Sequence, residues 1–252
     1  MISKPRIKDI KALQMPKFRQ IYNKFVAEGD KVCIEFLKSS KYGIENIYIT
    51  FENQNKYHIP TALLSKLEII SSKEMDQISG LKTPSDIIIV LDQKQDEINI
   101  LSQRGTSAIF LDGVQDPGNV GTIIRLADWF GIHAVIRSAD SADFFNPKVV
   151  QATMGSMANV HLCQAELADL TQYDKDIAGT YMEGQSIFNT ALSSDTILVL
   201  GSEGKGIRPE NSQWITQKIS IPGAKDKVAE SLNVSVAAGI IASVWKAGSP
   251  CI

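Results

Sequence analysis

The stretch DPGNVGTIIRLADWFG, residues 116–131, predicts a helix and raises a question about how that helix is used. Its apolar residues recur at the spacing of one helix face, at Val120, Ile123, Ile124, Ala127 and Phe130. Arg125 lies about 140° around the helix from Val120, away from that face. A Pro-Gly pair favours a turn, and the side chain of Asn119 can cap the helix. The stretch fits a capped helix with a solvated arginine, and also a helix N-terminus that holds phosphate or ribose beside Arg125.

The segments around this helix alternate between strand-like and helix-like patterns. We expect strands at 107–112, 133–137, 159–163, 176–181, 196–200 and 218–221, and helices at 119–130, 146–154, 166–172, 209–216 and 231–246. This alternation predicts an α/β fold with a parallel sheet that is covered on both faces. Ligands of such sheets bind at the carboxyl ends of the strands.

The N-terminal part has its own pattern and is expected to form a smaller α/β unit. Apolar spacing predicts helical segments within 10–26 and 30–40, and strands at 44–51 and 86–93. A polar stretch at 92–106 then interrupts the pattern. We therefore expect two domains, at 1–98 and 106–252.

The composition is that of an ordinary globular protein, with 44% hydrophobic and 21% charged residues among 252. Its formal net charge of -2 gives no general attraction to a polyanion, so a nucleic-acid partner would need a local basic patch. One candidate is the basic run Lys4, Arg6, Lys8, Lys11, Lys17, Arg19 and Lys24, which contains Asp9 as its one acidic residue. Such a run is either a solvated face or a contact surface for RNA.

Several classes of protein are disfavoured. The cysteines, Cys33, Cys163 and Cys251, are too scattered for a disulfide framework or a Cys-x-x-Cys metal site, and they fit a reducing cytoplasm. The histidines lie apart from one another and from carboxylates at ligand spacing, so no metal is expected. We find no apolar run long enough to span a membrane.

Two further stretches follow predicted strands. In LVLGSEGKGI, residues 198–207, three glycines surround Glu203 at a spacing that fits neither the dinucleotide fingerprint nor the P-loop. That stretch is either a tight turn or a loop that brings backbone groups against a ligand. In IPGAKDKVAESLNVSVAAGIIASVW, residues 221–245, Glu230 or Ser231 suits the start of a helix. Capping explains a serine there but explains Asn233 poorly, so a ligand or neighbouring chain is a candidate partner.

Together, and in this order, the three stretches resemble the SpoU (TrmH-like) family of RNA 2′-O-ribose methyltransferases, part of the SPOUT superfamily. The likeness covers residues 107–247. The segment KFRQIYNKFVAEGDKVCIEFLKS, residues 17–39, resembles the substrate-binding domain of many members, which is similar to an RNA-binding ribosomal protein. The resemblance implies a C-terminal domain with a deep trefoil knot, which the general rule against knots would not predict. It also implies S-adenosyl-L-methionine as cofactor and a homodimer whose site is completed across a two-fold interface.

The resemblance also assigns roles to residues. It implies a cofactor pocket lined by Thr180, Gly201, Glu203, Gly204, Ile221, Pro222 and Leu232. The implied catalytic set is Arg125 at the ribose hydroxyl, Asn119 positioning the ribose or the arginine, Glu203 and Asn233 shaping the site, and Ser231 near the phosphate or methyl donor. A guanidinium stays charged in proteins and is a poor base. We therefore expect Arg125 to bind the adjacent RNA phosphate and stabilise the developing alkoxide.

This chain departs from the family pattern at two places. PGAKDKVAE, residues 222–230, is a residue or two longer than in many members, and Gln151 stands where many have arginine. The assignments around 223–230, and a phosphate contact at Gln151, therefore do not carry over.

The predicted function is S-adenosylmethionine-dependent methylation of a ribose 2′-hydroxyl, with ribosomal RNA as the favoured substrate because an RNA-binding-like domain comes first. In this light the basic run, Lys4 to Arg19, is expected to contact RNA in the cytoplasm, with no membrane partner. Transfer RNA is the alternative substrate. A non-catalytic RNA-binding or ribosome-assembly protein of the same fold is the alternative class. A nucleotide phosphotransferase is disfavoured by the missing P-loop spacing and the lack of an evident magnesium-binding carboxylate set.

Overall fold

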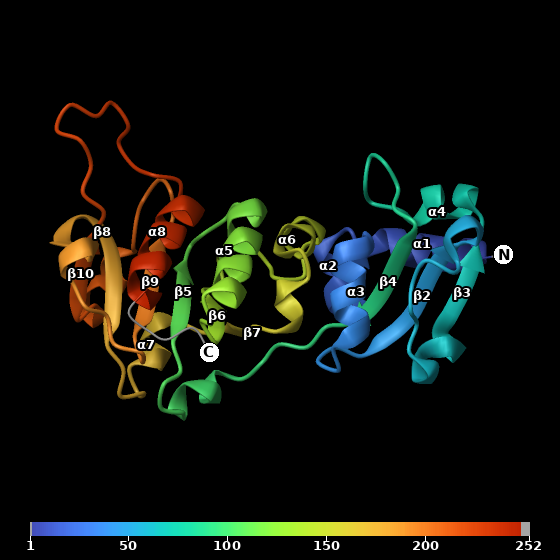
Figure 1. Ribbon diagram of the computed structural model, residues 1–252, viewed down its shortest axis with the longest axis horizontal. Helices are drawn as coiled ribbons and strands as arrows, with labels where there is room; N and C mark the ends of the chain where they lie inside the picture. Colours follow the sequence, from blue (N-terminus) through green and yellow to red (C-terminus); the bar gives the residue numbers. More distant parts are fainter. Residues whose placement is uncertain (1, 248–252) are drawn as a thin grey trace. The chain divides into compact units, whose positions relative to one another are not determined.

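The structure is a computed structural model that describes residues 2–247, and its chain forms two compact units (Figure 1). The first unit contains the residues up to Lys94 together with Asp143–Asn159, and the second contains Gln95–Ala142 and the residues from Val160 onward. Cys251 lies outside the described residues. Within residues 2–247, no helix combines the length and apolar character needed to cross a membrane.

The second unit is built on one parallel sheet with the strand order β10-β8-β9-β5-β6-β7. Its strands are β5 (Ala108–Asp112), β6 (Ala134–Arg137), β7 (His161–Gln164), β8 (Ile177–Ser186), β9 (Ile197–Gly201) and β10 (Gln217–Ser220). The central strands are buried and apolar, as expected for a sheet covered on both faces. The register pairs Asp112 with Gly201, so β5 and β9 end together. The predicted α/β fold with a parallel sheet is confirmed, while the knot stays a prediction.

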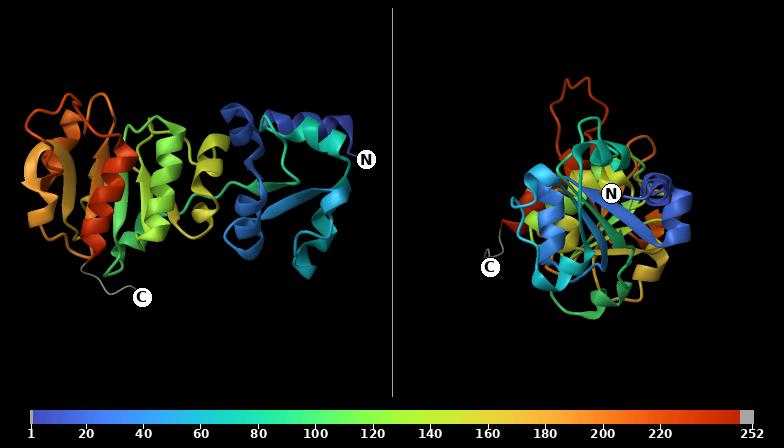
Figure 2. Two further views of the ribbon diagram at one scale, coloured as in Figure 1. Left: turned by 45° about the horizontal axis from the view of Figure 1, so that its top comes forward. Right: turned by 90° about the vertical axis from the view of Figure 1, so that its right-hand side faces the viewer.

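Helices cover both faces of this sheet. On one face lie α5 (Pro117–Trp129) and α8 (Val234–Lys246), side by side in Figures 1 and 2. A β-carbon on Gly239 of α8 would lie 3.7 Å from the methyl carbons of Leu126 of α5. The other face is covered by α7 (Leu167–Leu170) and the short 3-10 helices η3 (Ile98–Ser102) and η6 (Pro209–Trp214), whose apolar side chains join one core with those of β5, β6 and β9. Another 3-10 helix, η5 (Ile187–Asn189), packs against α8.

Helices α5 and α8 begin at residues other than those expected, and neighbouring capping residues explain the difference. Helix α5 begins at Pro117 and is capped by Asp116, whose carboxylate accepts a hydrogen bond from the backbone N–H of Asn119. Helix α8 begins at Val234 rather than near Ser231, and its cap is Asn233. Both arrangements place a preferred capping residue just outside the first turn. The expected caps at Asn119 and Ser231 are therefore wrong.

The first unit has a four-stranded mixed sheet in the order β1-β4-β2-β3. Its elements are β1 (Lys24–Glu28), β2 (Ile44–Thr50), β3 (Leu67–Ile70), β4 (Ile87–Asp92), α1 (Lys4–Ala12), α2 (Pro16–Tyr22), α3 (Asp30–Lys38), α4 (Ser72–Ile78), α6 (Pro147–Thr153), η1 (Phe51–Asn53), η2 (Thr61–Lys66) and η4 (Ser156–Ala158). Helices α1 and α4 share a core with β2 and β4. Helix α6 packs against β1 and α3, which explains why 143–159 belongs to this unit.

The helical segment expected within 10–26 is interrupted in the structure. Pro16 starts a separate helix, α2, and Asn23 ends it in the left-handed conformation, with φ of 51°. Strand β1 follows, and Phe25 is fully buried. A strand that is buried on both faces is apolar at successive positions. Periodicity alone cannot distinguish such a short run from the buried end of the preceding helix, so the sequence pattern merged α2 and β1.

Candidate active site

Three segments that are far apart in the sequence meet at the carboxyl edge of the parallel sheet. The side-chain nitrogen of Asn119, in the first turn of α5, donates a hydrogen bond to Glu203 Oε1 at 2.5 Å. The side-chain nitrogen of Asn233, at the start of α8, donates to Asn119 Oδ1 at 3.0 Å. One chain of hydrogen bonds therefore joins the loop after β5, the loop after β9 and the start of α8.

The capping residues leave the site side chains free for this arrangement. Because Asp116 caps α5, the side-chain amide of Asn119 is not used by its own helix. Asn233 has two tasks, since its Oδ1 accepts hydrogen bonds from the backbone N–H groups of Ser235 (3.0 Å) and Val236 (3.3 Å) while its nitrogen donates to Asn119. The position of Asn119 is thus coupled to the first turn of α8.

The glycine loop, residues 201–207, is a tight reversal that only small residues allow. Ser202 and Gly206 exchange two backbone hydrogen bonds, of 3.1 and 2.9 Å. A β-carbon on Gly201 would lie 2.1 Å from the carbonyl carbon of Gly206, which no larger residue tolerates. A β-carbon on Gly204 would meet nothing within 4 Å. The loop therefore displays Glu203 and the bare backbone of Gly204 at its exposed tip.

A buried network beneath the loop holds it to the sheet. The carboxylate of Asp112, at the end of β5, is fully buried and accepts hydrogen bonds from Arg208 N (2.8 Å), Arg208 Nε (2.5 Å) and Asn211 Nδ2 (3.0 Å). Burial opposes the charge on Arg208, but the hydrogen bond and charge of Asp112 outweigh it and raise the pKa of the guanidinium. This network fixes the residue that follows the glycine loop. Sequence reasoning missed Asp112, although a lone charge ending a wholly apolar strand was a usable signal.

The loop that leads from β5 toward α5 is fixed in a similar way. The hydroxyls of Ser138 and Ser141 accept hydrogen bonds from the backbone N–H groups of Gly113 and Val114, each at 3.0 Å. Ser138 also donates to Asp140. That hydrogen bond, together with the charge of Arg208, lowers the pKa of the Asp140 carboxyl. The segment before Asn119 is therefore held by side chains from the neighbouring strand end.

Two members of the expected catalytic set are not joined to these hydrogen bonds. Arg125 is exposed on α5, about 9 Å along the helix from Asn119, and forms no ion pair or hydrogen bond with another described residue. Ser231 is exposed in the loop 221–233, which projects from the unit between β10 and α8 (Figure 1). The single chain therefore brings together Asn119, Glu203 and Asn233, but not Arg125 or Ser231.

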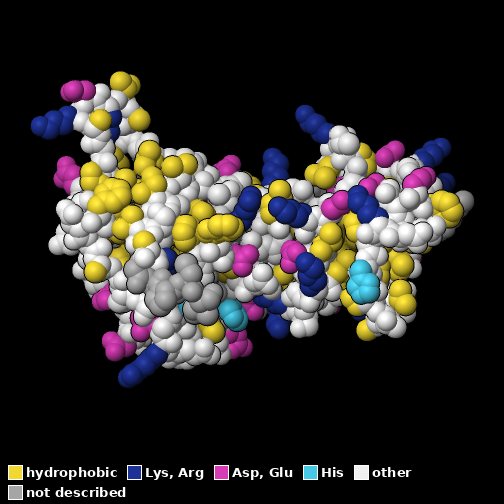
Figure 3. Space-filling model, in the orientation of Figure 1, with side chains coloured by type: hydrophobic (Ala, Val, Ile, Leu, Met, Phe, Trp, Pro, Cys, Tyr) yellow, Lys and Arg dark blue, Asp and Glu magenta, His cyan; other side chains and the backbone are white. Residues whose placement is uncertain are grey.

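The residues expected at the cofactor lie around the same edge. Thr180 of β8 donates to the backbone oxygen of Val199 at 3.2 Å. Ile221 is half-buried, whereas Pro222 and Leu232 are exposed. Hydrophobic side chains gather over α8 and the base of the preceding loop (Figure 3), where Leu232 and Val236 are 47% and 50% exposed. On α5, Trp129 is 82% exposed. Leu232 and Val236 therefore place exposed apolar side chains beside Asn233, whereas Trp129 lies at the far end of α5 from Asn119.

The basic run is divided by the structure. Lys4, Lys8, Lys11 and Lys17 are exposed on α1 and α2. Arg6 is half-buried and bound to Glu45 at 2.7 Å. Arg19 is 1% exposed and donates to Asp143 at 2.8 Å and to two backbone carbonyls at 3.1 Å. Its guanidinium holds the first unit together, so the expectation that Arg19 contacts RNA is not supported.

Within the part of the chain that the structure describes, no group of three or more His, Cys, Asp or Glu side chains is arranged to hold a metal ion. Gln151 lies half-buried on α6, in the first unit.

Comparison with known proteins identifies the family. Residues 106–243 match the model described as the SpoU rRNA Methylase family. The chain belongs to this family. Residues 4–88 match the model of the MRM3-like substrate binding domain. The resemblance that the three loop stretches carry is thereby confirmed.

Two relatives match nearly the whole chain. It is 28% identical to the 23S rRNA (guanosine(2553)-2′-O)-methyltransferase RlmP of Bacillus subtilis, with 94% of each chain covered. It is 30% identical to the 23S rRNA (guanosine-2′-O-)-methyltransferase RlmB of Coxiella burnetii, with 90% of this chain and 94% of that one covered.

Solved structures of RNA methyltransferases also match nearly the whole chain. A protein from Porphyromonas gingivalis assigned to the TrmH family of RNA methyltransferases matches with a TM-score of 0.87 and 36% identity, over 99% of this chain and 100% of that one. An AdoMet-bound rRNA methyltransferase from Sinorhizobium meliloti matches with a TM-score of 0.85 and 27% identity, over 97% and 95%.

Proposed function

We propose that this protein transfers the methyl group of S-adenosyl-L-methionine to a ribose 2′-hydroxyl of ribosomal RNA. The observation that carries the proposal is the hydrogen-bonded chain from Glu203 through Asn119 to Asn233, which gathers three loops at the carboxyl edge of a parallel sheet. Ligands of such sheets bind at this edge. The relatives from Bacillus subtilis and Coxiella burnetii are named as 23S rRNA guanosine-2′-O-methyltransferases, and the matching structure from Sinorhizobium meliloti is AdoMet-bound.

The residues at this edge suit the proposed cofactor. Half-buried Ile221 and exposed Leu232 offer apolar surface for a flat adenine ring. The uncovered backbone around Gly204 can meet the polar groups of a nucleoside. S-adenosyl-L-methionine, when bound, supplies a methyl group already activated by its positive sulfur. We place Thr180, Gly201, Glu203, Gly204, Ile221, Pro222 and Leu232 around it.

The protein's own residues then align the ribose and handle one proton. The amide of Asn119 is fixed by Glu203 and Asn233, yet one of its N–H groups donates to no residue within 2–247 and can orient a hydroxyl. Arg125 binds the neighbouring RNA phosphate and stabilises the developing alkoxide, because its guanidinium remains charged. The proton leaves through that phosphate or water. Ser231 lies near the phosphate or the methyl donor.

We further propose that the active enzyme is a knotted homodimer. Arg125 and Ser231 lie apart from the Asn119 hydrogen bonds within one chain, so a second copy would complete the site. The exposed apolar side chains of Val236 and Trp129 on α8 and α5 would be covered by that copy. Mixing Arg125→Ala with Asn119→Ala protein tests this, since a shared site would regain activity in mixed dimers. A mixture as inactive as either variant would place the whole site in one chain.

Two measurements test the function itself. Calorimetric titration with S-adenosyl-L-methionine should show saturable binding, which a purely RNA-binding protein need not show. Ribose methylation is then mapped across ribosomal and transfer RNA from cells with and without this chain. Loss of one methylation site in ribosomal RNA supports the proposal, whereas loss of a site in transfer RNA would identify transfer RNA as the substrate. With neither a lost site nor cofactor binding, the non-catalytic alternative would stand.

The exposed lysines of α1 and α2 support the choice of an RNA substrate. Lys4, Lys8, Lys11 and Lys17 would meet phosphates, so RNA affinity should fall steeply with added salt, whereas Arg6 is already paired with Glu45. A ribosomal RNA substrate would place the enzyme in the cytoplasm. Cys33 and Cys163 are buried, and the presence of such thiols fits a reducing compartment.

A further inference from the structure

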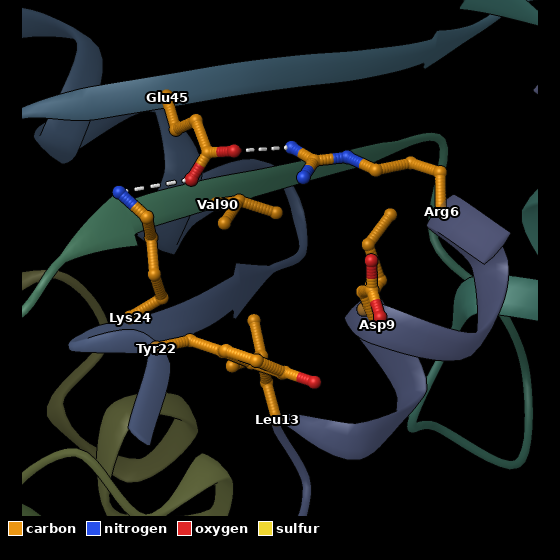
Figure 4. Close-up of a pocket in the computed structure, with 8 residues that line it drawn as sticks. Arg6, Asp9, Leu13, Tyr22, Lys24, Glu45 and Val90 are labelled. Carbon is orange, nitrogen blue, oxygen red and sulfur yellow. Dashed lines mark hydrogen bonds and ion pairs between the residues drawn. The ribbon is translucent and has the colours of Figure 1, made fainter. Parts of the chain in front are cut away.

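The first unit contains a small hollow that the proposed methyl transfer does not use (Figure 4). It encloses about 210 Å³ between α1, α2 and the adjacent sheet. Its lining consists of Arg6, Asp9, Ile10, Leu13, Tyr22, Lys24, Glu45 and Val90. This volume suits one planar nucleobase rather than a larger ligand.

The apolar part of the lining suits a flat ring. Ile10, Leu13 and Val90 are part of the buried core and form a hydrocarbon floor. Tyr22 is 41% exposed, and its ring is partly stacked on Phe18, with centroids 6.0 Å apart. A half-exposed aromatic ring beside an apolar floor is the arrangement on which unpaired bases stack in RNA-binding proteins.

The cations of the hollow are already paired. Glu45 bridges Arg6 at 2.7 Å and Lys24 at 2.9 Å, as Figure 4 shows, and Lys24 also binds Asp92. Burial would raise the pKa of Glu45, but the hydrogen bonds from Lys24 and Arg6 outweigh burial and lower it. Glu45 therefore stays ionised and offsets the charge of its partners.

One carboxylate at the hollow is available. Asp9 is exposed and forms no hydrogen bond or ion pair with any residue from 2 to 247. With Asp9 and Glu45 facing Arg6 and Lys24, the hollow itself does not favour a phosphate. The exposed lysines on the outer sides of α1 and α2 do favour phosphates. The charges thus direct a base into the hollow and leave the RNA backbone outside.

The free carboxylate also selects among the bases. Guanine presents two adjacent donors, N1–H and the 2-amino group, and can bind both oxygens of a carboxylate at once. Adenine, cytosine and uracil each place an acceptor next to their donor on that edge, which a carboxylate repels. We infer that this hollow holds one unpaired guanine of the RNA substrate, with Asp9 reading its edge and Tyr22 stacking on its face. The inference rests on the proposed function only for the identity of the ligand as RNA.

Binding of short RNA to the full chain tests the inference. Fluorescence anisotropy, without S-adenosyl-L-methionine, compares the labelled single strands UUGU, UUAU, UUCU and UUUU. We expect UUGU to bind about tenfold more tightly than the others, the discrimination of one bidentate base contact. Asp9→Asn replaces one acceptor oxygen by a donor and should reduce this preference to about twofold or less. Asp76→Asn is the matched control, because Asp76 is an exposed carboxylate on α4 outside the hollow.

A second pair of variants tests the stacking. Tyr22→Leu should weaken binding of UUGU about tenfold, whereas Tyr22→Phe keeps the ring and should bind as the wild type does. Thermal melting of each variant shows whether it is folded. Loss of binding in Tyr22→Leu alone, with the melting temperature unchanged, is the supporting result.

The outcomes separate this inference from the proposed function. If Asp9→Asn and Asp76→Asn behave alike, if UUGU is not preferred, or if no tetramer binds, the guanine site is wrong. Such results leave the methyl transfer intact when the protein still binds S-adenosyl-L-methionine and methylates whole RNA. If guanine preference depends on Asp9 but the cofactor does not bind, the guanine site stands and the proposed reaction fails.

Discussion

Two groups of hydrogen bonds lie at the carboxyl edge of the parallel sheet, and they differ in burial. The Asp112 carboxylate is fully buried and binds Arg208 and Asn211, so it fixes the backbone under the glycine loop. In the Asn119 group, Glu203 and Asn233 are exposed to solvent and Asn119 is half-buried. The buried group can only support the loops, whereas the exposed group can still bind a ligand. Substitutions should therefore affect stability in the first group and activity in the second.

The largest effect should come from Arg125, which is exposed and unpaired among the described residues. Arg125→Ala should lower methyl transfer by about 100-fold, the usual cost of removing one group that stabilises a developing oxyanion. Its free energy of unfolding should change by less than about 0.5 kcal/mol, because the side chain is solvated. Turnover with RNA and thermal melting measure the two effects.

Arg104→Ala is the matched control for Arg125, since Arg104 is another exposed arginine of the second unit. Arg125→Lys keeps the charge but loses the planar fork and should fall between the wild type and the alanine variant. Near wild-type turnover of Arg125→Ala would remove any catalytic role for this residue.

The next effect is on stability, at Asp112. Asp112→Asn keeps the size of the side chain but removes the charge that binds Arg208, and should lower the free energy of unfolding by about 2 kcal/mol. Because the glycine loop is then less well held, S-adenosyl-L-methionine should also bind more weakly. Denaturant unfolding and calorimetry measure these effects. Asp174→Asn, at an exposed aspartate, is the control and should change neither the free energy of unfolding nor the cofactor affinity. If Asp112→Asn also changes neither quantity, Asp112 does not support the glycine loop.

A smaller effect separates the two tasks of Asn233. Asn233→Ala removes both the helix cap and the hydrogen bond to Asn119. It should lower the free energy of unfolding by about 1 kcal/mol and should also lower methyl transfer. Asn233→Ser should keep the cap but lose the donor to Asn119, so that activity falls about tenfold with little loss of stability. If the serine variant is fully active, the contact with Asn119 is only structural.

The elements that the sequence predicts well are those whose pattern is local. The apolar spacing of α5 and the unbroken apolar runs of β5 and β9 identify a covered parallel sheet, and that sheet implies a ligand edge. Asp116 before a Pro-Gly pair was also a usable capping signal, because proline favours the first helical position.

Contacts between distant residues could not be predicted in this way. Asn119 meets Glu203 across 84 positions and Asn233 across 114, and only the strand order brings them together. Arg19 looks like one more surface cation in a basic run, yet its partner Asp143 lies 124 positions away. Hydrophobic pattern cannot reveal which charge of a run is buried by a partner that folds back from later in the chain.

The smallest effect should appear at the opposite, amino edge of the same sheet, where no ligand is expected. The backbone N–H of Ser107 donates to His133 Nδ1 at 3.2 Å, while Lys246 donates to the Ser107 hydroxyl. Burial, and then the charge of Lys246, lowers the pKa of His133 below its usual 6.5. A folded-state pKa below the unfolded value gives a contribution that is complete above pH 6.5 and is lost as the pH falls below it.

Between pH 7 and 5 the melting temperature of the wild type should therefore fall slightly more than that of His133→Asn, which keeps an acceptor for Ser107 but does not titrate. A difference of about 1 °C is expected, because His133 is only partly buried and solvent screens its charge. Methyl transfer compared at one pH should not distinguish His133→Asn from the wild type, because this edge supports the sheet and takes no part at the carboxyl edge. A loss of activity in His133→Asn would show that the amino edge of the sheet also contributes to the reaction, against the expectation that only the carboxyl edge does.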